Sequence, residues 1–121
     1  MTKKVVLYCR VSSEILKKDL DRQKRMLVGH CLVNEYDLVW EFKEIAPSSD
    51  QVKWLQLMEF VTKNSESVDL VLATDWDRFS RDRDELRNDG LWLFKEFGIC
   101  LDTVETPVPE TELETFLYSL Q

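Results

Sequence analysis

Four short apolar segments constrain the fold of this chain most strongly, because a stretch with helical spacing follows each of them. The first and third are continuous apolar runs, as in buried parallel strands, and the second alternates with polar residues, as at a sheet edge. The expected strands are Lys3–Cys9, Asp37–Ile45, Val68–Thr74 and Ile99–Val104. Strands that alternate with helices predict an α/β fold, with a three-layer, open, mostly parallel sheet and helices on both faces.

Three of the expected helices carry simple stripes on one face. The stripes are Trp54, Leu55, Met58 and Val61; Leu86, Gly90, Leu93 and Phe97; and Leu113, Phe116, Leu117 and Leu120. Gly98 is expected to stop the second of these helices, and Thr111 with Glu114 to form a capping box at the start of the third.

The first helix, expected after a polar loop over residues 12–18, contains one unusual position. Leu20, Leu27 and Cys31 share a face, and Gln23 lies at the edge of the same stripe. An amide that leans towards an apolar face requires a hydrogen-bond partner. We therefore expect Gln23 to make a specific polar contact.

Charge and hydropathy bound the function. The 121 residues suffice for one domain with its own core, and the net charge is −7. Such a chain cannot neutralise phosphates over its whole surface, so any action on nucleic acid requires a local basic cluster or another domain. No run approaches a membrane span and the N-terminus leads directly into a strand, which favours a cytoplasmic protein without a membrane partner.

The residue types argue against a cofactor. The three cysteines, Cys9, Cys31 and Cys100, are widely spaced, and His30 is the single histidine, which is a poor basis for a zinc site. With only three glycines the chain has no phosphate-binding glycine loop, so no nucleotide cofactor is expected.

Two basic clusters follow the first and third expected strands. Arg10 is followed by Ser12 and Ser13, and Arg78 and Arg81 lie three residues apart in the second cluster. Because ligands of such sheets bind beyond the carboxyl ends of the strands, we expect the two clusters to form one site.

Arginines beside a serine hydroxyl suit phosphoryl transfer to serine, since fixed guanidinium groups stabilise charge on the phosphate oxygens. Asp77 could orient one arginine or donate a proton. The alternative is a capped, solvated helix start, with Arg10 in a surface ion pair and Ser12 in a turn; residue spacing alone leaves both interpretations open.

The order of these motifs resembles one family. Tyr8-Cys9-Arg10-Val11-Ser12, then Gln23, then Asp77-Arg78-Phe79-Ser80-Arg81-Asp82 looks like the catalytic domain of serine recombinases, the resolvase, invertase and large serine integrase family. Residues 98–107 resemble the family's last strand and the approach to its long dimerisation helix. The resemblance implies a resolvase-like catalytic domain over residues 1–106 and the start of a truncated dimerisation helix over residues 107–121.

The resemblance also implies roles. Ser12 is the nucleophile that attacks DNA to form a 5′-phosphoserine linkage and a free 3′-hydroxyl. Gln23 helps to hold the phosphate or the arginines, and Asp77 supports the arginines or takes part in proton transfer. The scissile phosphate is bound and activated by Arg10, Arg78 and Arg81. The implied reaction, site-specific DNA recombination, uses neither metal nor ATP, and the full-length protein works as a homodimer that pairs into a tetramer.

The chain departs from the family pattern at two positions near the phosphate. An arginine that usually precedes the second helix is replaced by Gln51, with Lys53 nearby, and a position that is often basic is Asp75. Within these 121 residues the expected dimerisation helix is short, and no DNA-binding domain is expected after it. Two interpretations therefore stay open: a catalytic piece of a longer recombinase, or a truncated or degenerate relative that acts as a non-catalytic interaction or regulatory protein. An unrelated flavodoxin-like module fits the element order but does not explain arginines at two strand ends.

Overall fold

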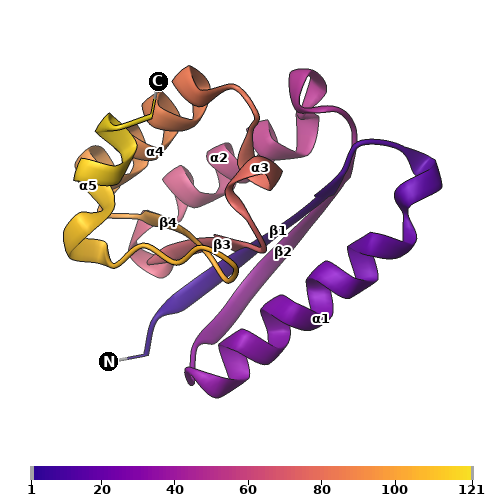
Figure 1. The fold of residues 1–121 in the computed structure, drawn as a ribbon. Helices are drawn as coiled ribbons and strands as arrows, with labels where there is room; N and C mark the ends of the chain where they lie inside the picture. The colour runs from indigo at the N-terminus through magenta and orange to yellow at the C-terminus, as the bar shows by residue number, and fades with distance from the viewer. Residues whose placement is uncertain (1, 121) are drawn as a thin grey trace.

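A four-stranded parallel sheet forms the centre of the computed structural model, which describes residues 2–120 except for the side chain of Ser48. The strands lie in the order β2-β1-β3-β4 (Figure 1). Their bounds are Lys4–Val11 for β1, Asp37–Ile45 for β2, Leu70–Ala73 for β3 and Cys100–Thr103 for β4. All neighbouring strands are parallel, which confirms the predicted α/β architecture and the edge position of the second strand.

The helices α1 (Lys18–Val33) and α2 (Val52–Lys63) cover opposite faces of the sheet. Alternate residues of a strand point to opposite faces. In β2, Phe42 packs against Phe60 of α2, whereas its neighbour Glu41 forms an ion pair with Lys24 of α1. Figure 1 shows α1 on its own side of the sheet.

The central strand β1 is longer at its end than its apolar run predicted. Arg10 and Val11 still pair with Glu44 and Ile45 of β2, so the strand ends at Val11, directly before Ser12. Its residues from Val5 to Val11 are all buried. The expected third strand was three residues too long, and the expected fourth strand was two residues too long.

Three helices follow β3 and β4: α3 (Trp76–Phe79), α4 (Arg83–Phe97) and α5 (Glu110–Tyr118). Helix α3 was not predicted. Asp82 caps α4, and Gly98 ends it with φ of 68°, as expected. The expected capping box of α5 is wrong, because the helix begins at Glu110, directly after Pro109, and no side chain caps it.

The core side of α2 also differs from the predicted stripe. Trp54, Leu57 and Val61 face the sheet, whereas Leu55 is 68% exposed. The buried positions are spaced by three and four residues, and Leu55 falls outside that face.

Helix α5 packs closely on α4. Leu117 is fully buried above Gly90, where an added Cβ would lie 2.9 Å from a Leu117 methyl carbon. Gly90 thus allows α5 to approach α4 closely. The expected start of the dimerisation helix, residues 107–121, includes Gln121, which lies outside the described residues. No helix within residues 2–120 has the length and apolar character to cross a membrane.

Candidate active site

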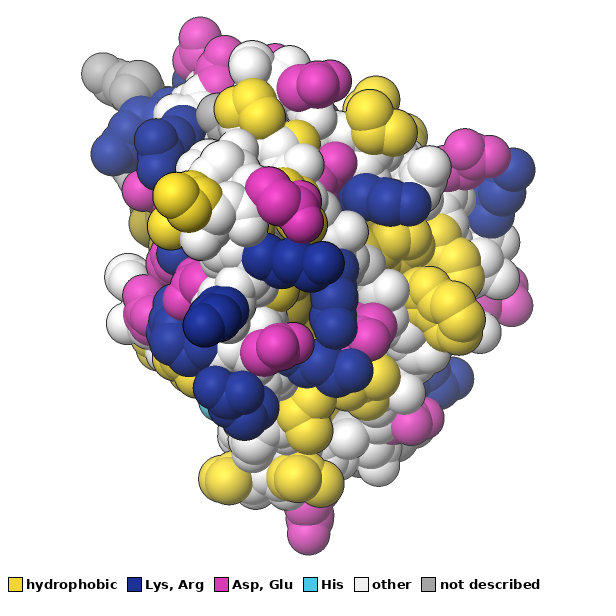
Figure 2. Space-filling view, turned by 90° about the vertical axis from the view of Figure 1, so that its right-hand side faces the viewer, with side chains coloured by type: hydrophobic (Ala, Val, Ile, Leu, Met, Phe, Trp, Pro, Cys, Tyr) yellow, Lys and Arg dark blue, Asp and Glu magenta, His cyan; other side chains and the backbone are white. Residues whose placement is uncertain are grey.

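The two basic clusters meet at the carboxyl end of β1. Because β3 lies beside β1 and leads through a short loop into α3, the backbone of α3 comes within hydrogen-bond distance of Arg10. The Arg10 Nε atom donates to the carbonyl of Arg78 over 3.0 Å. Figure 2 shows the side of the molecule where β1 ends and α1 begins: basic side chains gather at its centre, and acidic side chains lie among them.

Arg10 is a buried residue whose side chain links three segments, namely β1, α3 and the residue that follows β2. The residue is 2% exposed, and each of its guanidinium nitrogens donates to a main-chain carbonyl. Besides Arg78, the acceptors are Ala46 after β2, over 3.0 Å, and Asp77 in α3, over 2.6 Å. Burial lowers the pKa of the Arg10 guanidinium, and these carbonyl dipoles offset part of its desolvation.

Arg78 occupies a more open position with charged partners. Its Nη1 atom donates to the Arg10 carbonyl over 3.2 Å. Its Nε atom contacts Asp75 Oδ2 at 3.1 Å, and its Nη2 atom lies 3.6 Å from Asp19 Oδ2. The guanidinium therefore faces a protein oxygen at every nitrogen.

Gln23 has the partner that the sequence required. Its Nε2 atom donates to the Arg10 carbonyl over 2.9 Å, and its Oε1 atom accepts from the Arg10 amide over 3.1 Å. The pairing of β1 with β3 ends at Leu7, so Arg10 has no strand neighbour on that side. The Gln23 amide replaces the missing strand, and its burial follows from that contact.

Ser12, Arg81 and Asp77 remain exposed. Ser12 follows β1 directly, and its hydroxyl makes no hydrogen bond to another side chain or backbone group within residues 2–120. Ser13 is also exposed and begins the turn of residues 14–16. Asp77 contacts Arg10 through its carbonyl rather than through its carboxylate. The site thus combines accessible groups with a fixed arginine layer behind them.

Comparison with known proteins identifies the family of the chain. Residues 5–120 match the family model for Resolvase, N terminal domain. The chain belongs to this family. The match confirms the resemblance to serine recombinase catalytic domains.

Solved structures of serine recombinases resemble this resolvase-family domain. The C-terminal catalytic domain of ISC1926 TnpA, an IS607-like serine recombinase, is 27% identical over 95% of this chain and 76% of that chain, with a TM-score of 0.73. A serine recombinase from Sulfolobus solfataricus is 29% identical over 98% and 79%, with a TM-score of 0.66. A resolvase family site-specific recombinase from Streptococcus pneumoniae shares the fold, with 24% identity over 98% and 85% and a TM-score of 0.83. A search of curated proteins found no match.

Gln51, at or near the position where the resemblance implies a usual arginine, makes hydrogen bonds within the resolvase-family domain. Gln51 Nε2 donates to the Tyr8 hydroxyl over 2.8 Å and to the Phe79 carbonyl over 2.6 Å. Tyr8 in turn donates to Glu44 Oε1 over 2.7 Å, and burial raises the Tyr8 pKa far above its usual value. The side chain of Lys53 is exposed, while its amide donates to Glu44 over 2.7 Å. Gln51 therefore joins a buried network instead of supplying a positive charge.

Sequence reasoning missed Asp19 and Glu44. Both had a signal: Asp19 lies four residues before Gln23 on one helix, and Glu44 continues the even-numbered positions of β2 that face α2. Each carboxyl group fixes several donors, as Asp19 accepts from Arg22 and Gln23 and Glu44 accepts from Tyr8 and two backbone amides.

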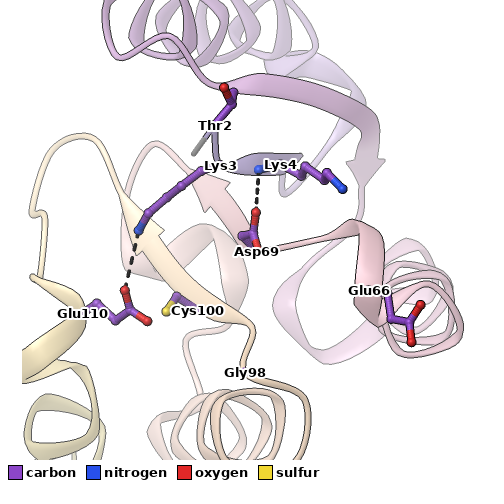
Figure 3. Close-up of a pocket in the computed structure, with 8 residues that line it drawn as sticks. All are labelled: Thr2, Lys3, Lys4, Glu66, Asp69, Gly98, Cys100 and Glu110. Atoms are coloured by element: carbon purple, nitrogen blue, oxygen red, sulfur yellow. Dashed lines mark hydrogen bonds and ion pairs between the residues drawn. The ribbon is translucent and has the colours of Figure 1, made fainter.

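Two cavities flank the domain at different ends. One, of about 210 Å³, lies beside Arg81 and is lined by α3, α4 and α5 residues that include Trp76 and Phe116. The other, of about 360 Å³, lies at the amino ends of β1 and β4 (Figure 3), where Lys3 pairs with Glu110 at 3.7 Å and the Lys4 amide donates to Asp69. This cavity lies at the opposite end of the sheet from Ser12. Within residues 2–120 no three metal-ligating side chains gather.

Proposed function

We propose that this domain is the catalytic part of a site-specific serine recombinase, with Ser12 as the nucleophile. The observation that carries the proposal is the position of Ser12, exposed at the carboxyl end of the central strand and two residues after the fixed Arg10, in a chain of the resolvase family. An exposed hydroxyl can reach a phosphodiester, and the arginines behind it can stabilise charge on the phosphate oxygens.

The proposed reaction joins Ser12 Oγ to the scissile phosphorus and expels the 3′-oxygen of the neighbouring nucleotide. The product is a 5′-phosphoserine linkage and a free 3′-hydroxyl, and attack of a 3′-hydroxyl on that linkage rejoins DNA and restores Ser12. Because the phosphodiester is exchanged for a phosphoester of similar energy, the proposed cycle uses neither metal nor ATP. A proton must leave Ser12 and reach the 3′-oxygen, and Asp77 is our candidate for part of that transfer.

The arginines divide into two roles in this proposal. Arg10 holds β1, α3 and the end of β2 together and thereby positions the backbone from which Ser12 extends. Arg81 and Arg78 supply positive charge to the phosphate, and Gln23 keeps the end of β1 in place. The proposed partner is DNA, with a homodimer or tetramer in the full-length protein. We keep residues 1–106 as the proposed catalytic core and residues 107–121 as the proposed start of the dimerisation helix.

A second candidate function has its own support. Arg78 is engaged by two carboxylates, and Gln51 is turned away from the site. Both features reduce the positive charge offered to a phosphate, as expected for a non-catalytic relative that acts through protein interactions.

Trapping of a covalent protein–DNA adduct separates the two functions. The chain, with whatever its reading frame adds beyond Gln121, is incubated at low salt with a plasmid library that includes the DNA around its gene, and is then denatured. We expect an adduct at DNA 5′ ends that Ser12→Ala abolishes and Ser13→Ala retains, because Ser13 is an equally exposed neighbouring hydroxyl.

An adduct that is undiminished in Ser12→Ala would remove Ser12 from the mechanism. A folded protein that gives no adduct under any of these conditions would favour the non-catalytic function.

A further inference from the structure

Arg78 is the arginine of the site whose charge is most closely balanced by carboxylates. Asp75 lies 3.1 Å from its Nε atom and Asp19 lies 3.6 Å from its Nη2 atom. The three side chains are 26–29% exposed, so the group is partly shielded from water yet open to a ligand. An anion that approaches Arg78 meets two carboxylates beside the guanidinium, of which Asp19 is also paired with Arg22.

The two carboxylates are held to different degrees. Asp19 also accepts hydrogen bonds from Arg22 and Gln23, and the Arg22 hydrogen bond lowers the pKa of the Asp19 carboxyl, so this group is ionised at neutral pH. Among the described residues 2–120, Asp75 has only one further side-chain donor, the Thr74 hydroxyl at 3.3 Å. The Arg78–Asp75 ion pair is therefore easier to break than the Arg78–Asp19 ion pair.

The Asp75 side chain also has alternative hydrogen-bond donors, in the first turn of α3. It is the N-cap residue of α3, with extended backbone angles (φ −145°, ψ 166°), but its side chain makes no capping hydrogen bond. An aspartate at this position commonly accepts from the amides two or three residues later, which here are those of Asp77 and Arg78. The Arg78 amide donates to the Asp75 carbonyl over 3.2 Å, so the Asp77 amide is the donor that the carboxylate can gain. The carboxylate that now holds Arg78 can thus exchange the guanidinium for the first turn of α3.

We propose that Asp75 and Asp19 are positioning residues that compete with phosphate for Arg78, and that phosphate binding requires the Arg78–Asp75 pair to open. The inference rests on the proposed function in one respect only, namely that Arg78 is a phosphate ligand. In the closed arrangement Asp75 occupies the Nε edge of the guanidinium, which is one of the edges that a phosphate oxygen would use. In the open arrangement Asp75 caps α3, and the freed edge faces the anion.

Binding of inorganic sulfate, a phosphate mimic, tests the proposal without DNA. The chain is titrated with sulfate while NMR follows the arginine Nε–H resonances. We expect Asp75→Asn to raise sulfate affinity about tenfold, because it removes a like charge next to the anion and keeps an N-cap side chain. We expect Asp19→Asn to give a smaller gain, since its oxygen is fixed by other donors. The Arg78 Nε–H resonance should move most in Asp75→Asn.

Two matched variants control for charge alone and for the identity of the ligand. Asp21→Asn removes one negative charge from the same helix as Asp19 at an exposed position, and should change sulfate affinity less than twofold. Adding Arg78→Ala to Asp75→Asn should cancel the gain. If Asp75→Asn proves poorly folded by circular dichroism, Asp75→Ser offers an uncharged N-cap residue and is expected to give the same gain.

A gain in Asp75→Asn no larger than that in Asp21→Asn would overturn the proposal, and so would a gain that survives Arg78→Ala or an absence of sulfate binding in every variant. Ser12→Ala should bind sulfate as the unmodified chain does. If the folded, unmodified chain forms no DNA adduct while Asp75→Asn still gains sulfate affinity, the proposed function is rejected and this inference stands.

Discussion

Two polar networks approach the last residues of β1 from opposite faces of the sheet. The Glu44 network consists of Tyr8, Glu44 and Gln51 with the first amides of α2, and its central carboxyl group is 4% exposed. The Arg78 network consists of Arg78, Asp19, Asp75 and Gln23 with the backbone of Arg10, and its carboxylates are more than a quarter exposed. Both contain a carboxyl group with several donors, yet water reaches only one of them readily.

The difference in exposure separates a structural function from an exchangeable one. When a buried acceptor is removed, its donors are left without water or protein partners. The free energy of unfolding then falls several times more than it does when a partly exposed ion pair is lost. The Glu44 network is therefore expected to persist throughout the life of the folded domain, whereas the Arg78 network can trade a carboxylate for a ligand.

The largest expected effect comes from breaking the Glu44 network. Glu44→Ala should lower the free energy of unfolding by about 3 kcal/mol, because the Tyr8 hydroxyl and the amides of Lys53 and Trp54 lose their acceptor. Urea denaturation measures the change. Glu44→Gln keeps the shape and one acceptor oxygen and should lose less; equal stability of Glu44→Ala and the unmodified chain would show that this network is not structural.

An intermediate effect is expected at the buried end of the Arg78 network. Gln23→Leu should lower the free energy of unfolding by about 2 kcal/mol, since the Arg10 amide loses its acceptor and the Arg10 carbonyl keeps only the Arg78 Nη1 donor. The matched variant Gln56→Leu, at an exposed position of α2, should change it by less than about 0.5 kcal/mol. Similar urea midpoints for the two variants would mean that Gln23 does not replace a strand.

The smallest effect is expected at the exposed end of the same network. Asp75→Asn should change the free energy of unfolding by less than about 0.5 kcal/mol, because a partly exposed ion pair contributes little and asparagine is a favourable N-cap residue for α3. Thermal and urea denaturation both report the change. A loss of about 2 kcal/mol or more would place Asp75 with the structural residues and contradict the proposed exchange.

Much of this contrast was accessible from the sequence, but only at the level of elements. The apolar runs and the parallel-sheet rule correctly brought Arg10 and Arg78 together, because the carboxyl ends of neighbouring parallel strands share an edge. The need of Gln23 for a partner was also correctly predicted. The identity of that partner, the Arg10 backbone, could not be predicted. It depends on the residue at which β3 ends, and no local sequence pattern encodes that residue.

The partners of the arginines could not be predicted from spacing. A guanidinium on a long side chain can reach any of several oxygens, and the choice of Arg10 for three carbonyls and of Arg78 for two carboxylates depends on the tertiary arrangement. For the same reason the wrong leucine was assigned to the core face of α2. Leu55 and Leu57 are both apolar, and the path of α2 across the sheet decides which one is buried.

The hydrogen bonds of the Arg10 side chain couple the position of α3 to that of β1. Its guanidinium fastens the end of β1 to the backbone of both Asp77 and Arg78, and Ser12 follows only two residues later. Any shift of α3 that accompanies release of Arg78 must therefore pull on the strand that carries Ser12. The Arg10 side chain therefore couples the contacts of Arg78 to the orientation of the Ser12 hydroxyl.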